Sequence, residues 1–202
     1  MSRYDKTHMA AAMDVLQYAH NTKEYGLYYG SGVDIELKGF FHGYWPGDIL
    51  DSKCTTGYIF SLGQDIASPL TWKSKKQPVK TTSLAESELM AGSDACKEGS
   101  WLRYLLDGMG YKQKHATPLG IEERAIIEIT EDPSLSVRQK HIDIKFHYMR
   151  ECILEKKMFS LSKINLDKQA AKFLTSALCQ QDFNICLKLN AIGPASNHTP
   201  RS

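Results

Sequence analysis

The stretch TTSLAESELMAGSDACKEGSWLRYLL, residues 81–106, predicts one long helix that organises the rest of the chain. Its interior is filled by Ala, Leu, Met, Glu and Lys, which all favour helix. Thr82 or Ser83 can cap its start, and Glu86 follows Ser83 at the spacing of a capping box. Gly108 predicts where the helix ends.

An apolar stripe along this helix carries one carboxylate, which is the first candidate site residue. At helical spacing the stripe consists of Leu84, Glu88, Ala91, Ala95, Leu102 and Leu106. Glu86 points elsewhere, because residues two apart do not share a helix face. A carboxylate on an inward face needs a partner. From the residues alone, Glu88 either pairs with a cation, lies at the wet edge of the stripe, or is a metal ligand.

Composition places the chain among ordinary globular proteins. It has 202 residues, of which 42% are hydrophobic and 24% charged, and its net charge of +2 does not indicate a nucleic-acid partner. Because it lacks a long apolar run and a signal peptide, we expect no membrane partner and an intracellular location, cytoplasmic or nuclear. The five cysteines lack CxxC spacing, which favours reduced thiols over a zinc site.

Short strand patterns separated by turn residues surround the long helix. Strands are expected at residues 25–29, 35–44, 55–62, 70–74, 117–121 and 158–161. Further helices are expected at residues 8–20, 123–130, 140–155 and 167–178, with helix or coil at 183–189 and a disordered tail over the last ten residues. This order predicts a mixed α/β sheet covered by helices, with an antiparallel meander first.

Six short segments also follow one another in an informative order. They are LKGFFHGYWPGD (37–48), KCTTGY (53–58), WKSKKQ (72–77), ESELMA (86–91), KHIDIKFHYMRE (140–151) and QAAKFLT (169–175). In this order and spacing the set resembles the C-terminal part of the Pol polyprotein of copia-type retrotransposons, where the end of the reverse transcriptase precedes a ribonuclease H domain. Residues 8–27 are similar to that reverse-transcriptase end.

The resemblance implies a ribonuclease H-like fold, which is a mixed five-stranded sheet with three antiparallel strands first. It divides the chain into a reverse-transcriptase remnant (1–25), a ribonuclease H-like domain (26–178) and a partly disordered C-terminal extension (179–202). The chemistry it implies is hydrolysis of the RNA strand of an RNA–DNA hybrid. Two magnesium ions, held by carboxylates from separate elements, do that work in the family.

The four positions that match the family's carboxylates are degenerate here. Glu88 is retained, while Glu122, His42 and Lys172 each stand where the family has Asp. Histidine suits softer metals than magnesium, and an ammonium repels a divalent cation. We therefore expect little or no catalysis and no cofactor, with Mg²⁺ or Mn²⁺ at Glu88 and Glu122 if activity remains. A further hypothesis is that Lys172 neutralises Glu88 and Glu122.

A basic cluster lies beside the third strand of the expected meander. Lys73, Lys75, Lys76 and Lys80 flank Trp72 in this cluster. Lysines next to an aromatic residue fit contact with nucleic-acid phosphates, but they also fit protection of an edge strand. Both interpretations stay open.

Three functions are compatible with these residues. The chain can be a non-catalytic module that binds an RNA–DNA hybrid or other nucleic acid. It can be a residual metal-dependent ribonuclease H, or a protein-interaction module or relic without function. The substitution of three metal positions favours the first and third functions. The sequence does not identify a protein partner.

Overall fold

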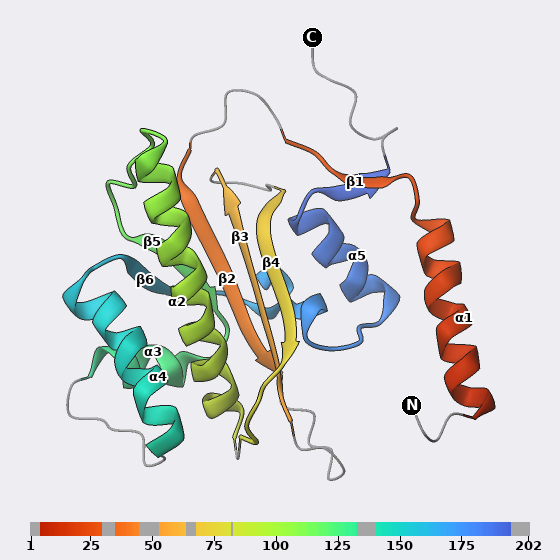
Figure 1. Ribbon diagram of the computed structural model, residues 1–202, viewed down its shortest axis with the longest axis horizontal. Coiled ribbons are helices and arrows are strands. Elements are labelled where there is room, and N and C mark those ends of the chain that lie inside the picture. The colour runs from red at the N-terminus through yellow and green to blue at the C-terminus, as the bar shows by residue number, and fades with distance from the viewer. Residues whose placement is uncertain are drawn as a thin grey trace.

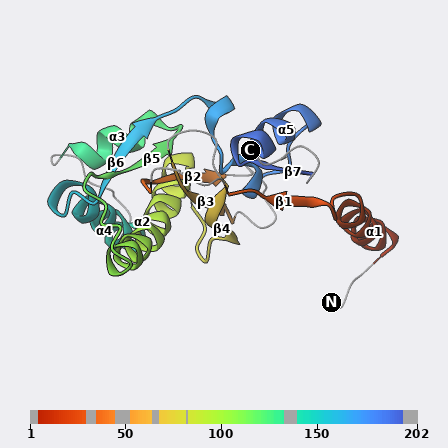
Figure 2. The same ribbon diagram turned by 90° about the horizontal axis from the view of Figure 1, so that it is seen from above.

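The computed structural model describes residues 5–29, 35–44, 53–63, 68–81, 83–132 and 140–194, apart from the side chains of 140–142. Its centre is a five-stranded sheet in the order β4-β3-β2-β5-β6 (Figure 1). Helices α2 and α4 lie on one side of this sheet and α5 lies on the other, as the view from above shows (Figure 2). The predicted ribonuclease H-like architecture is confirmed.

The first half of the sheet is the predicted antiparallel meander. It consists of β2 (Leu37–Tyr44), β3 (Thr55–Leu62) and β4 (Pro69–Lys76). Each strand pairs with the next in antiparallel register, with Phe41 opposite Tyr58 and Ile59 opposite Trp72. Strand β3 is buried along most of its length, because it is a central strand with both faces covered.

The second half of the sheet is parallel. Strand β5 (Thr117–Ile121) pairs with β2, and β6 (Phe159–Lys163) pairs with β5. Three elements connect β5 to β6, namely α3 (Arg124–Glu131), α4 (Lys140–Arg150) and a single π-helical turn, η1 (Glu151–Glu155). The α-helix expected over residues 140–155 therefore ends at Arg150 and continues as the π turn.

Helix α2 (Leu84–Gly108) covers β2 and β3, as its sequence predicts. Ser83 caps it by accepting a hydrogen bond from the Glu86 backbone N–H at 3.2 Å. The predicted stripe is buried except for Leu84, which is 41% exposed. The prediction was wrong there because Leu84 opens the helix, one turn before α2 comes against β2 at Gly43.

The helix expected over residues 167–178 is absent, and that prediction was wrong. The described chain has two 3₁₀ turns there, η2 (Leu166–Lys168) and η3 (Lys172–Leu174), followed by α5 (Gln180–Leu189). These turns keep backbone bonds to carbonyls three residues earlier, and side chains add further bonds. Gln169 accepts from the Ala171 N–H and donates to the carbonyl of Phe41, while the Thr175 hydroxyl donates to the carbonyl of Lys172. Such local bonds compete with helix.

A separate small sheet pairs a strand from the N-terminal part of the chain with the last described strand. Strand β1 (Tyr25–Leu27) pairs antiparallel with β7 (Ile192–Pro194), so the strand expected at 25–29 is shorter and lies outside the main sheet. Before it, α1 (Lys6–Asn21) is capped by Asp5 and has no buried residue. None of the helices in the described ranges is both long and apolar enough to cross a membrane. Residues 195–202, most of the expected tail, lie outside the description.

Candidate functional site

Glu88 is held in place by a close approach of α2 to β2. A Cβ at Gly43 would touch the backbone carbonyl of Ser87 and would lie 2.6 Å from the Glu88 backbone nitrogen. The glycine therefore lets the helix reach the strand, and its N–H donates to the Glu88 carboxyl group. Gly43 was not predicted as a site residue, although a glycine inside a strand is a known signal of close backbone approach.

The carboxyl group of Glu88 lies in a dry environment. Its side chain is 1% exposed, and burial raises its pKa well above the ordinary value. The hydrogen bond from Gly43 opposes this rise, whereas the charges of Glu122 and Glu123 add to it. Among the described residues Oε2 has no hydrogen-bond partner. Burial therefore favours the neutral, protonated form of this carboxyl group.

His42 precedes Gly43 on β2, and neighbouring residues of a strand point to opposite faces of the sheet. The His42 side chain therefore lies on the face away from α2. Its Nδ1 lies 2.7 Å from the Thr175 hydroxyl oxygen. Because that hydroxyl donates its proton to the Lys172 carbonyl, Nδ1 must carry the hydrogen of the neutral ring. Gly57, opposite His42 on β3, leaves the space that Thr175 occupies. Burial, and then the charge of Lys172, lower the pKa of His42 to about 4.

Lys172 has a partner that no sequence motif indicated. Its Nζ lies 2.9 Å from Oδ2 of Asp182 on α5, and its side chain is mostly buried. The hypothesis that Lys172 neutralises Glu88 by pairing with it is therefore wrong, since Asp182 takes the ammonium group. The charge of Lys172 still lowers the pKa of Glu122, as that part of the hypothesis expected.

Glu122 is the fourth predicted site position, and it follows β5 directly. Strands β2 and β5 are parallel neighbours, so the ends that carry His42 and Glu122 lie at the same edge of the sheet. Burial raises the pKa of Glu122, Lys172 lowers it and Glu123 raises it. The fold thus brings the four predicted positions close enough to influence one another electrostatically. Their roles stay predictions.

Comparisons with known proteins bear on the predicted resemblance and on the fold. No protein-family model matches the sequence. Over 192 residues, or 95% of the chain, it is 30% identical to the retrovirus-related Pol polyprotein from transposon TNT 1-94 of Nicotiana tabacum. The chain spans only 14% of the length of that polyprotein. The predicted resemblance to copia-type Pol polyproteins is confirmed.

Solved structures agree on the architecture. RNase H1 from Halobacterium salinarum NRC-1 matches with a TM-score of 0.51 and 10% identity, over 69% of this chain and 94% of that one. LC11-RNase H1, solved in complex with an RNA/DNA hybrid, matches with a TM-score of 0.50 and 13% identity over 69% and 94% of the two chains. The chain has a ribonuclease H fold.

The site of this ribonuclease H-like chain does not fit two magnesium ions. Within the described ranges, no three His, Cys, Asp or Glu side chains are grouped to hold a metal ion. Burial disfavours the charged forms of Glu88 and His42, and Lys172 brings a positive charge to a position where the resemblance implies a carboxylate. A hard divalent cation requires several anionic oxygens, which this set does not offer.

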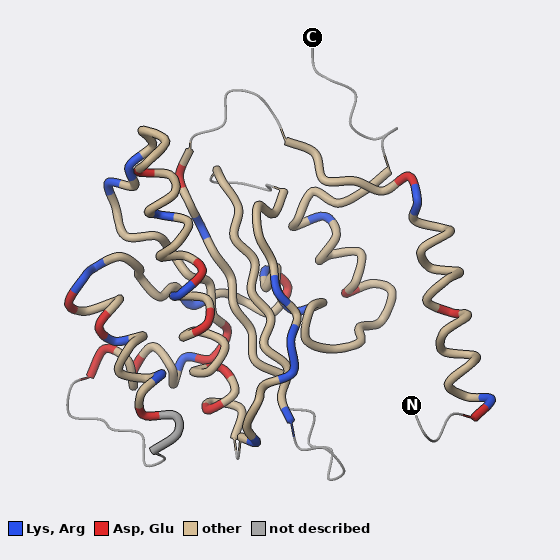
Figure 3. Tube along the Cα trace, in the orientation of Figure 1, with Lys and Arg blue, Asp and Glu red and all other residues tan. Residues whose placement is uncertain are grey.

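The predicted basic cluster of the ribonuclease H-like chain is divided between the two faces of β4. Figure 3 shows lysines along this strand. Lys73 faces α2, where it lies 3.8 Å from Asp94 and 5.6 Å from the centre of the Tyr58 ring. Trp72 is on the other face and is 55% exposed. Lys75, Lys76 and Lys80 are exposed. The fold therefore places Lys73 apart from Trp72.

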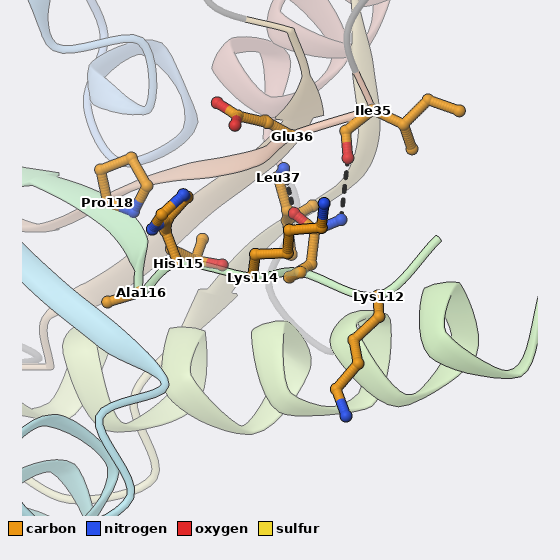
Figure 4. Close-up of a pocket in the computed structure, with 10 residues that line it drawn as sticks. Ile35, Glu36, Leu37, Lys112, Lys114, His115, Ala116 and Pro118 are labelled. Atoms are coloured by element: carbon orange, nitrogen blue, oxygen red, sulfur yellow. Dashed lines mark hydrogen bonds between the residues drawn. The ribbon is translucent and has the colours of Figure 1, made fainter. Parts of the chain in front are cut away.

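A pocket of about 380 Å³ lies at the opposite end of the sheet from His42, where β2 begins. The Gln113 side chain lines it, accepting from the Leu37 N–H at 2.7 Å and donating to the Ile35 carbonyl at 2.8 Å (Figure 4). Gln113 thus satisfies the backbone at the start of β2. This pocket contains none of the predicted site residues, and its bonded amide has a structural role.

Proposed function

We propose that this chain is a retrotransposon-derived ribonuclease H-like module that binds an RNA–DNA hybrid or other nucleic acid without cleaving it. The observation that carries the proposal is the ion pair between Lys172 and Asp182. A positive charge fixed at a position where the resemblance implies a metal-binding carboxylate opposes the entry of a divalent cation. Without that cation the attacking water is not activated.

Binding without cleavage needs a surface that attracts phosphates. Lys76 is exposed at the end of β4 on the same face as the exposed ring of Trp72, while Lys75 is exposed on the other face and Lys80 is exposed after the strand. Lysines attract the phosphate backbone in a salt-dependent way, and an exposed aromatic ring can stack on a base. The RNA/DNA hybrid bound by LC11-RNase H1 supports the hybrid as the first ligand to test.

The test measures cleavage and binding of one labelled RNA–DNA hybrid. We expect no cleavage in Mg²⁺ or Mn²⁺, and binding that persists in EDTA and weakens between about 50 and 200 mM salt. Replacing Lys75 and Lys76 with Gln should lower the slope of log affinity against log salt by about one per lysine. Lys114→Gln, an exposed lysine at the opposite end of the sheet, serves as the matched control and should leave the slope unchanged.

Two other outcomes would replace this proposal. Cleavage that disappears in Glu88→Ala would show a residual metal-dependent nuclease. This alternative is favoured by Oε2 of Glu88, which has no hydrogen-bond partner in the described part of the chain. Neither cleavage nor binding would favour a protein-interaction module or a relic. The exposed Met9, Met13 and Leu16 of α1 favour the interaction alternative, because they form an apolar stripe on a helix with no buried residue.

A further inference from the structure

The lysine-bearing segment, residues 75–81, combines exposed lysines with two buried polar residues. Lys75 and Lys76 end β4 and Lys80 follows it, and all three are exposed. Gln77 and Thr81 are only 3% and 4% exposed. The segment leads from the end of β4 to the start of α2 (Figure 1). Buried polar side chains are hydrogen-bonded as a rule, so the partners of Gln77 and Thr81 show what holds the segment.

Gln77 is bonded to both α2 and the start of β3. Its Nε2 donates to the Ser87 carbonyl at 3.0 Å and to the Thr56 hydroxyl at 3.1 Å. Its backbone N–H donates to the Cys54 carbonyl at 2.8 Å. Because the Ser87 carbonyl can only accept, the amide nitrogen must face it, and this fixes the orientation of the Gln77 side chain.

Thr81 attaches the other end of the segment to the same buried residue. Its hydroxyl is hydrogen-bonded to the sulfur of Cys54, which is fully buried. Cys54 therefore holds both ends of the stretch 77–81, through its carbonyl at one end and its sulfur at the other. Pro78 lies between the two attachments, and its ring fixes the backbone angle φ. Few conformations are open to a stretch that is restrained in this way.

The Gln77 side chain also connects the segment to the candidate site. The Ser87 carbonyl that it binds directly precedes Glu88, and the same carbonyl is the group against which Gly43 lies. Gln77 therefore ties the lysine-bearing segment to the point where α2 meets β2. The backbone that carries the lysines is thereby held at a defined position relative to Glu88.

We infer that Gln77 and Thr81 are positioning residues that hold the lysine-bearing segment in a shape ready to contact the phosphates of a nucleic acid. The inference rests on the proposed function. A flexible segment loses conformational freedom when it binds, and this loss weakens affinity. The buried hydrogen bonds of Gln77 and Thr81 impose the order when the chain folds, so binding does not have to.

Positioning and charge affect the salt dependence of binding differently. The number of phosphates that lysines neutralise sets the slope of log affinity against log salt. Preorganisation changes affinity equally at every salt concentration. Gln77→Met, which keeps the length of the side chain and removes its donors, should weaken binding of the labelled RNA–DNA hybrid roughly three- to tenfold at an unchanged slope. When Lys75 and Lys76 are already Gln, the same change should weaken binding less, because Gln77 acts through these lysines.

The matched control is Asn190→Leu. Asn190 is 1% exposed, and its Nδ2 donates to the carbonyls of Ala170 and Cys186, so the variant also removes buried amide bonds to backbone. Urea unfolding should show that both variants lose stability, whereas only Gln77→Met should lose affinity. Binding is measured where circular dichroism shows each variant to be folded.

A second variant and a second measurement test the same inference. Thr81→Val removes the other attachment and should also weaken binding without changing the salt slope, which decides the matter if Gln77→Met does not fold. In the unbound chain, amide hydrogen exchange over residues 75–81 should become faster in either variant.

Three results would overturn the inference and leave the proposed function standing. They are full affinity in both Gln77→Met and Thr81→Val, an equal loss of affinity in Asn190→Leu, and a lowered salt slope in Gln77→Met. The last result would mean that a phosphate contact was lost instead of order. A parent chain that does not bind the hybrid would overturn the proposed function and this inference together.

Discussion

The candidate site extends over both faces of strand β2, and the electrostatic conditions differ between these two faces. On the α2 face, Glu88 is dry and one of its oxygens has no partner among the described residues. On the other face, His42 bonds Thr175, and Lys172 pairs with the half-exposed Asp182. One face thus keeps a carboxylate that burial drives toward its neutral form, while the other holds a cation in an ion pair. The comparison teaches that burial and partners, and not residue type alone, govern which charge state of a group is favoured.

The largest expected effect comes from disrupting the close contact between β2 and α2 at Gly43. Gly43→Ala should destabilise the fold by about 3 kcal/mol or more, because the new methyl group would meet the backbone of Ser87. Urea unfolding measures the change. Gly108→Ala, where nothing lies within 4 Å of a Cβ, is the control and should have little effect. Equal stability of the two variants would show that α2 does not press on β2.

The next effect concerns acid stability on the His42 face. Burial and Lys172 lower the pKa of His42 from 6.5 to about 4, so the unfolded chain binds the extra proton more readily. The stabilisation is complete above pH 6.5 and is lost as the pH falls toward 4, by about 3 kcal/mol in all. His42→Asn should flatten this part of the profile of unfolding free energy against pH. An unchanged profile would contradict the burial of a neutral ring.

The Glu88 face should respond to pH with the opposite sign. Its pKa is raised above the ordinary value of 4.5, so the folded chain holds the proton more tightly. This contribution is complete below pH 4.5 and is lost as the pH rises through the folded-state pKa, by about 1.4 kcal/mol per unit of pKa difference. Glu88→Gln should therefore match the parent near pH 4 and exceed its stability at pH 8. A Gln variant that is less stable at pH 8 would indicate a required negative charge.

The smallest effect is expected from the ion pair itself. A double-mutant cycle with Lys172→Met and Asp182→Asn should give a coupling free energy of about 0.5–1 kcal/mol, because Asp182 is 43% exposed and water screens the pair. High salt should reduce the coupling. The exposed pair of Arg124 and Glu128 provides the control cycle and should couple less. A coupling free energy no greater than that of the control cycle would show that Asp182 does not hold the Lys172 ammonium group in place.

Local pattern was sufficient for much of the fold. The predicted ranges of β3 and β5 agree with the structure residue for residue, because alternating or continuous apolar residues and flanking turn residues delimit them. Ser83 marks the start of α2 for a similarly local reason. The segment at 167–178 was mispredicted, because it forms 3₁₀ turns with backbone bonds to carbonyls three residues earlier and with added bonds from the side chains of Gln169 and Thr175. Periodicity contains no information about such bonds.

The sequence by itself determined the mixed sheet and the inward position of Glu88, because helix and strand periodicity suffice for both. The ribonuclease H fold and the expected substitutions at His42, Glu122 and Lys172 follow only from the resemblance to copia-type Pol polyproteins. Only the tertiary structure decided the partners: Gly43 for Glu88, Thr175 for His42, Asp182 for Lys172. Burial and contacts between distant segments set these partners and the charge of each group, and neither is written in local sequence.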